Sequence, residues 1–136
     1  MRKLIISILL FATFISCDKD LGNLKYMETV PGGCAIEKGS FLKSAQILKN
    51  DTVSYSITDG NLDLFVGFNA TCCGQYSTSY EIKEETIFIR ILTTQSGDCN
   101  CICYYTYNFR FTGSGNNYKY QVTVDDYLTF TGQIKP

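Results

Sequence analysis

Cysteine is the residue type that could do chemistry in this chain of 136 residues, which has no histidine. Seven cysteines are present: Cys17, Cys34, Cys72, Cys73, Cys99, Cys101 and Cys103. The absence of histidine excludes Ser-His-Asp triads, Cys-His dyads and imidazole-ligated metals. No Cys-x-x-Cys redox motif occurs either. The chemistry left to these thiols is acylation, disulfide formation or the binding of a soft metal ion.

Cys17 differs from the other cysteines in what precedes it. Arg2 and Lys3 are followed by an uncharged, mostly apolar stretch over residues 4–15 and then by Ser16. The stretch has the length of a signal-peptide core and falls short of the roughly 20 residues that span a bilayer. Positive residues, an apolar run, a small residue and a cysteine, in this order, resemble the signal peptide of bacterial lipoproteins.

That resemblance implies that residues 1–16 are removed and that Cys17 carries the lipid. Asp18, Lys19 and Asp20 are similar to a surface-export signal of Bacteroidetes lipoproteins. We therefore expect a chain anchored in the outer membrane by its N-terminal lipid and exposed at the cell surface. A periplasm-facing anchor, or an ordinary secretory signal, is the alternative.

Charge excludes nucleic acid as a partner. The full chain has 12 Lys and Arg against 13 Asp and Glu, and removal of residues 1–16 takes away two positive charges. The expected mature chain is mildly acidic, whereas nucleic-acid binding needs a basic surplus. Asp51-Thr52-Val53 is similar to the short O-glycosylation sequon of Bacteroidetes, which makes Thr52 a candidate for modification.

The six other cysteines are even in number, which predicts disulfides in an exported chain. Cys99, Cys101 and Cys103 share one side of a predicted strand, where residues two apart are separated by roughly 6.5–7 Å. Because disulfides seldom bridge that distance between parallel side chains, bonds within the trio are disfavoured. Each member of the trio is expected to bond one residue of the set Cys34, Cys72 and Cys73. Six cysteines allow about fifteen connectivities, and the spacing does not choose among those that remain.

A metal site is the alternative for the same thiols. Cys99, Cys101 and Cys103, together with Cys72, could present thiolates to Zn or Cu(I). The one-residue spacing is shorter than that of structural zinc motifs. Free, buried thiols are a third possibility. No cofactor is expected under the disulfide interpretation.

The elements that position the cysteines are predicted to be strands. Asp59-Gly60 joins alternating segments at residues 52–58 and 61–69, and a type I′ turn there would pair Val53 with Val66. Glu84-Glu85 separates residues 76–83 from 86–93 in the same way. Residues 17–33 are expected to form a lipid-anchored tether, which could include an initial strand near residues 25–30. Residues 34–136 form the single domain, in which 39–49 could be a short helix or another strand.

Three more segments complete the predicted domain. Residues 101–112 are expected to pair with 118–124 through a loop at 114–117, and 118–124 with 128–134. These pairings place Phe111 opposite Tyr120 and Val122 opposite Phe130. The fold class predicted is all-β, an antiparallel β-sandwich or small barrel of about seven to eight strands built from hairpins.

The function predicted from these features is non-enzymatic. The acidic pairs Glu84-Glu85 and Asp125-Asp126 fall in predicted turns, where solvated charges are expected, so a two-carboxylate glycosidase site is disfavoured. We expect a lipid-anchored binding module for a protein, a protease or a glycan, with contact loops at 94–98 and 114–117. Metal binding and a purely structural accessory role are the alternatives. Residues 98–109 resemble a Cys-x-Cys-x-Cys-Tyr strand of small Bacteroidetes lipoproteins, which implies no particular activity.

Overall fold

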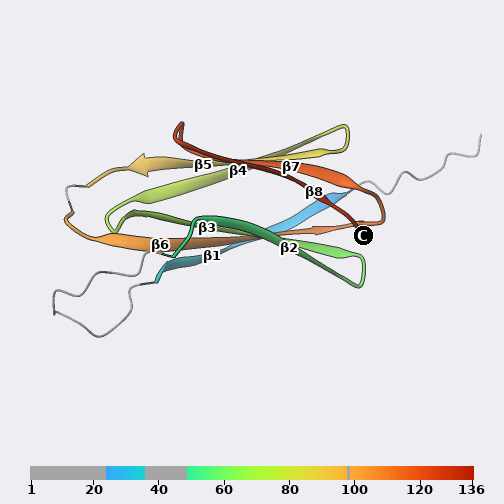
Figure 1. Ribbon diagram of the computed structural model, residues 1–136, viewed down its shortest axis with the longest axis horizontal. Helices are drawn as coiled ribbons and strands as arrows, with labels where there is room; N and C mark the ends of the chain where they lie inside the picture. Colours follow the sequence, from blue (N-terminus) through green and yellow to red (C-terminus); the bar gives the residue numbers. More distant parts are fainter. Residues whose placement is uncertain (1–23, 36–48, 98) are drawn as a thin grey trace, which may run out of the picture.

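The protein is a β-sandwich of two four-stranded sheets (Figure 1), seen in a computed structural model that describes residues 24–35, 49–97 and 99–136. The eight strands are β1 (Lys25–Ala35), β2 (Thr52–Thr58), β3 (Asn61–Thr71), β4 (Gln75–Lys83), β5 (Thr86–Gln95), β6 (Ile102–Thr112), β7 (Tyr118–Val124) and β8 (Leu128–Ile134). One sheet has the order β1-β6-β3-β2 and the other β4-β5-β7-β8. The sheets do not close into a barrel, so the predicted all-β class is confirmed as a sandwich.

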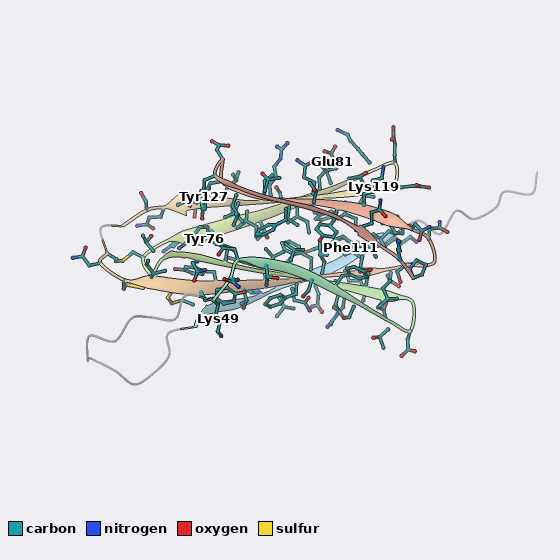
Figure 2. All side chains as sticks on the ribbon, viewed as in Figure 1. Lys49, Tyr76, Glu81, Phe111, Lys119 and Tyr127 are labelled. Atoms are coloured by element: carbon teal, nitrogen blue, oxygen red, sulfur yellow. A yellow bond between two sulfur atoms is a disulfide. The ribbon has the colours of Figure 1, made fainter. Side chains whose placement is uncertain are left out.

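Alternation along the strands creates the core between the sheets. In β6, every second residue from Cys103 to Phe111 is buried, and the residues between them are only partly covered. In β3 the buried set begins at Leu62 and in β5 at Ile87. Successive side chains of a strand point to opposite faces, so each sheet turns one apolar face inward. Tyr76 and Phe111 point into the space between the sheets, whereas Glu81 and Lys119 point away from it (Figure 2).

Three hairpins have the register that the sequence predicts. Val53 pairs with Val66, Ile82 with Ile87, and Val122 with Phe130. At the first turn, Asp59 and Gly60 have φ angles of 51° and 74°, as a type I′ turn requires. The tight turns fix these registers, because a slip of one residue would move every apolar side chain to solvent.

The predicted hairpin between residues 101–112 and 118–124 is wrong. β6 lies between β1 and β3, and its Phe111 is opposite Leu62 and Tyr26. β7 belongs to the other sheet, where it runs parallel to β5 and Tyr120 is opposite Ile87. The connection over residues 113–117 crosses from one sheet to the other instead of reversing within one. The strands on either side of this connection, β6 and β7, alternate between buried and more exposed residues. The same alternation is expected for a hairpin and for a crossing between sheets, so the sequence pattern does not distinguish the two.

The domain begins earlier than the sequence suggests, because part of the expected tether is strand β1. Leu24 is buried and Tyr26 packs against the core. Sequence analysis allowed a strand only near residues 25–30, because Pro31, Gly32 and Gly33 follow. β1 is at the edge of its sheet, where proline is tolerated, and the register shifts between Pro31 and Gly33. The expected helix or strand at 39–49 lies almost wholly outside the described residues.

Candidate functional site

Two chain crossings lie side by side at one end of the sandwich. The first, between β3 and β4, spans residues 72–74, and the second, between β5 and β6, spans residues 96–101. The backbone N–H of Cys72 donates to the carbonyl of Cys101 at 3.1 Å. The strand directions bring Cys34, at the end of β1, to the same place. We call this region the disulfide end; it is on the left in Figure 1.

Three disulfides occupy the disulfide end. They join Cys34 to Cys103, Cys72 to Cys101 and Cys73 to Cys99, with Cα–Cα distances of 5.3, 5.6 and 6.0 Å. These distances are within the range that disulfides span. Each member of the 99/101/103 trio is thus bonded to one of the three other cysteines. Three disulfides in a small domain indicate an extracytoplasmic protein, since they do not persist in a reducing cytosol.

The pairing of β3 with β6 explains which cysteines meet. Ala70 is opposite Cys103 and Thr71 is opposite Ile102. One step further along the same register places Cys72 opposite Cys101. Cys103 is buried, whereas Cys101 precedes the first residue of β6 and is exposed. This long-range strand pairing was the information missing from the sequence.

Aromatic side chains support the crossings from the core side. The hydroxyl of Tyr105 lies 3.0 Å from the carbonyl oxygen of Thr71 and 3.2 Å from that of Gly74, so it can donate to either. The ring of Tyr76 packs edge-on against Tyr105 and Phe68, with centroid distances of 4.9 and 5.3 Å. Burial, together with the nearby Tyr127 and Tyr105, raises the pKa of Tyr76 to about 12. These rings form the floor beneath the disulfides.

Asp125, in the β7–β8 turn, is hydrogen-bonded to the neighbouring strand β5 at the disulfide end. Its carboxylate accepts hydrogen bonds from the backbone N–H and the hydroxyl of Thr93, both at 2.7 Å. Its own N–H donates to the carbonyl of Ile91 at 2.8 Å. Burial and the charge of Asp125 raise the pKa of the adjacent Tyr127. Asp125 therefore has a positioning role that the sequence interpretation, which left it as a solvated turn residue, did not detect.

Three sulfur atoms, all in disulfides in this structure, lie close enough together to hold a metal ion if they were reduced to thiols. The Sγ atoms of Cys34, Cys72 and Cys103 all lie within 4.8 Å of one another. Cys99 and Cys101, which the sequence placed in the metal alternative, are bonded to Cys73 and Cys72 and are not part of this group. Sequence analysis named Cys34 as a disulfide candidate but left it out of the metal alternative.

The two predicted contact loops lie at opposite ends of the sandwich. Residues 94–97 are exposed at the disulfide end, and Asp98 lies outside the described residues. The loop at 114–117 lies at the other end, where Ser114 is buried and its N–H donates to the carbonyl of Gly60. Thr52, the glycosylation candidate, is half-buried as the first residue of β2. The lipidation candidate Cys17 lies outside the described residues.

Two shallow hollows mark the outer faces of the sheets. One of about 330 Å³ is bordered by Glu81, Phe88 and Arg90, and one of about 370 Å³ by Asp63, Phe65 and Asn108. Glu81 is paired with Lys83 at 2.9 Å, and Asp63 accepts a hydrogen bond from Arg110 at 2.8 Å. The carboxylate in each hollow thus has a cationic partner, and the two hollows lie on different sheets. Neither brings two carboxylates together for acid–base catalysis.

No protein-family model, characterised protein or solved structure matches this chain. Within the residues that the structure describes, no helix is both long and apolar enough to cross a membrane. The fold and its disulfides define the class: a small, disulfide-rich β-sandwich domain.

Proposed function

We propose that this chain is a lipid-anchored binding module of the bacterial cell envelope, without enzymatic activity, whose disulfide end contacts a protein or a glycan. The observation that carries the proposal is the direction of β1. The strand starts at Lys25, at the end of the sandwich opposite the disulfides, and runs to Cys34 within the disulfide end. An anchor at Cys17 therefore attaches to the end that is remote from the disulfides.

The reach of the chain supports this orientation. Seven residues lead from Cys17 to Leu24, and at most about 3.6 Å per residue gives a tether of about 25 Å. The 11 residues of β1 add about 36 Å at strand rise. A domain tethered at Cys17 thus keeps the start of β1 within about 25 Å of the bilayer, while the disulfide end can lie farther out.

The disulfide end has the properties of a pre-organised contact surface. Thr94, Gln95, Ser96 and Gly97 are exposed, and the segment is tied down by the Cys73–Cys99 bond. Loops held in one conformation lose less entropy on binding, which raises affinity without adding contacts. A protease inhibitor that presents residues 94–98 beside Cys99 is one form of this function.

The anchor is tested by acyl labelling and membrane fractionation of a Cys17→Ala variant. We expect this variant to lose the acyl label and to leave the membrane fraction. A Ser16→Ala variant keeps a small residue before the cysteine and should behave as the unmodified protein does. Membrane retention of the Cys17→Ala variant would contradict lipid anchoring.

The contact surface is tested with a glycan array and a panel of purified proteases. Ser96→Arg changes the disulfide end, and Asn117→Arg makes the same change in an exposed residue at the opposite end. We expect any probe that binds the unmodified protein to bind the Ser96→Arg variant at least tenfold more weakly and the Asn117→Arg variant equally well. Loss of binding only in the Asn117→Arg variant would reverse the proposed orientation. An absence of binding to all probes would favour a purely structural accessory role.

A further inference from the structure

Three sulfur atoms gather at the disulfide end, and a fourth is bonded to one of them. Those of Cys34, Cys72 and Cys103 lie within 4.8 Å of one another, and Cys101 is bonded to Cys72. Two of the three disulfides are thus neighbours. The third, Cys73–Cys99, joins residues outside this group.

The backbone that carries these sulfurs is held independently of the disulfides. Hydrogen-bonded ladders join β1 to β6 and β3 to β6 up to the cysteines, with Cys34 opposite Tyr105 and Ala70 opposite Cys103. Reduction of the two bonds would therefore leave the thiols of Cys34, Cys72 and Cys103 close together, with the thiol of Cys101 beside that of Cys72. In a tetrahedral zinc site with Zn–S bonds near 2.3 Å, the sulfurs are about 3.8 Å apart. The sulfurs of Cys34, Cys72 and Cys103 already lie within 4.8 Å of one another, and the thiol of Cys101 would turn toward them once its bond to Cys72 is broken.

We propose that the reduced form of this protein binds a soft d10 cation, such as Zn²⁺, through Cys34, Cys72, Cys101 and Cys103. The proposal is independent of the lipid anchor and of the contact surface. Two molecules of a dithiol reductant supply four electrons and four protons, which convert the two disulfides to four thiols and leave two oxidised reductant molecules. Four S–Zn bonds then form as the thiols release their protons.

The burial of the four cysteines fits a site that is enclosed by the core and reached from solvent on one side. Cys103 is 1% exposed and packs in the core, whereas Cys34 and Cys72 are half-buried. Cys101 is exposed, so the ion has a route from solvent to the buried ligands. Four cysteine ligands complete a tetrahedral coordination without water, as in structural zinc sites. The ion would replace the two covalent links between β1, β6 and the β3–β4 crossing by a single centre.

The experiment uses the mature chain with Cys17→Ala, so that the seventh thiol does not contribute, after reduction and removal of the reductant under anaerobic conditions. Co²⁺ alone is the first probe, because its thiolate charge-transfer absorption reports the number of bound sulfurs, and Zn²⁺ is then added in competition. Two double variants are compared. Cys73→Ser with Cys99→Ser keeps the proposed ligands, and Cys34→Ser with Cys103→Ser removes two of them. Each leaves four thiols.

We expect the parent and the first double variant to bind one Co²⁺ through four thiolates, and the second double variant to bind at least 100-fold more weakly. Equal affinity of the two double variants would show chelation by an unstructured chain and overturn the proposal, as would an absence of binding in the parent. Alkylation at equimolar Zn²⁺, read by peptide mass, is the second measurement and remains valid if a variant folds poorly. In the parent, Cys73 and Cys99 should be modified and the four ligands protected. Protection of Cys99 in place of Cys34 would assign a different ligand set.

Discussion

The two ends of the sandwich are held together by different means. At the disulfide end, three covalent bonds join the crossings and the end of β1. At the opposite end, Phe111 is fully buried and lies within ring-packing distance of Tyr26 and Tyr80, which stack on each other at 4.0 Å. There the crossing between β6 and β7 is fixed by hydrogen bonds from Gly113 and Ser114 to the carbonyl of Gly60.

The crossings at the two ends have similar polar compositions and differ in what holds them: residues 113–117 are also glycine, serine and asparagine. Apart from cysteine, residues 72–74 and 96–101 are glycine, serine, asparagine and aspartate. Such segments have little apolar surface to bury, so hydrophobic burial contributes little to holding them. The crossing at the opposite end is followed directly by Tyr118, which is buried. Disulfides thus hold the two polar crossings at the disulfide end, whereas hydrogen bonds and the burial of Tyr118 hold the crossing at the opposite end.

The largest effect is expected from Phe111→Ala at the opposite end. Removing a fully buried phenylalanine leaves a cavity and should lower the free energy of unfolding by about 3–5 kcal/mol. The loss should be similar with and without reductant, because the disulfides are remote. Chemical denaturation measures it, with Phe65→Ala, on the outer face, as the milder control. If Phe111→Ala lowered the free energy of unfolding only after reduction, the stabilities of the two ends would depend on each other.

The disulfides should contribute unequally to stability. Cys34–Cys103 closes a separation of 69 residues, and its removal as a double alanine variant should lower the free energy of unfolding by about 2–4 kcal/mol. Cys73–Cys99 spans 26 residues and is nested within the 29 residues of Cys72–Cys101. The outer bond already restricts that loop in the unfolded chain, so removing the inner bond should cost less. Equal losses in thermal unfolding would contradict this entropic explanation.

Tyr76 should give the disulfide end a response to alkaline pH. Its pKa is raised from 10.0 to about 12 by burial first and by neighbouring tyrosines second. Because the fold favours the neutral phenol, its contribution to stability is complete below pH 10 and is lost as pH rises through 12. A tyrosinate absorbance titration of the protein and of Tyr76→Phe isolates this group. A Tyr76 that ionised near pH 10 would show that the floor beneath the disulfides is open to water.

The smallest effect is expected at the β4–β5 turn. Glu84 has a φ of 53°, a left-handed conformation that costs a non-glycine residue free energy. Relief of this strain exceeds the extra entropy that glycine loses on folding, so Glu84→Gly should raise the free energy of unfolding by about 0.5–1 kcal/mol. At the other end, Gly97→Ala should destabilise, because a Cβ there would lie 2.7 Å from Cβ of Cys73. Changes of opposite sign in the free energy of unfolding would confirm that glycine relieves strain at the β4–β5 turn and that the crossing at Gly97 has no room for a Cβ.

The alternation of apolar residues and the turn residues predicted the features that neighbouring residues determine. The registers of β2 with β3 and of β7 with β8 follow from short turns, and the structure confirms them. The placement of β6 depends on contacts far apart in the chain, and the alternation around residues 113–117 does not encode it. The same gap explains the cysteines. That Cys72 meets Cys101 is a consequence of the β3–β6 ladder, which no short segment specifies.

The disposition of β1 has a mechanical consequence. The strand enters at one end and is covalently joined to β6 at the other through Cys34 and Cys103. A pulling force between the N-terminal side and the disulfide end would run along the backbone of β1 and through that bond. Because this path is covalent, the hydrogen bonds of the β1–β6 ladder would carry little of the load and would not be broken one at a time. The remaining strands would lie outside the load path, so a domain held at its N-terminus could resist traction on its far end without unfolding its core.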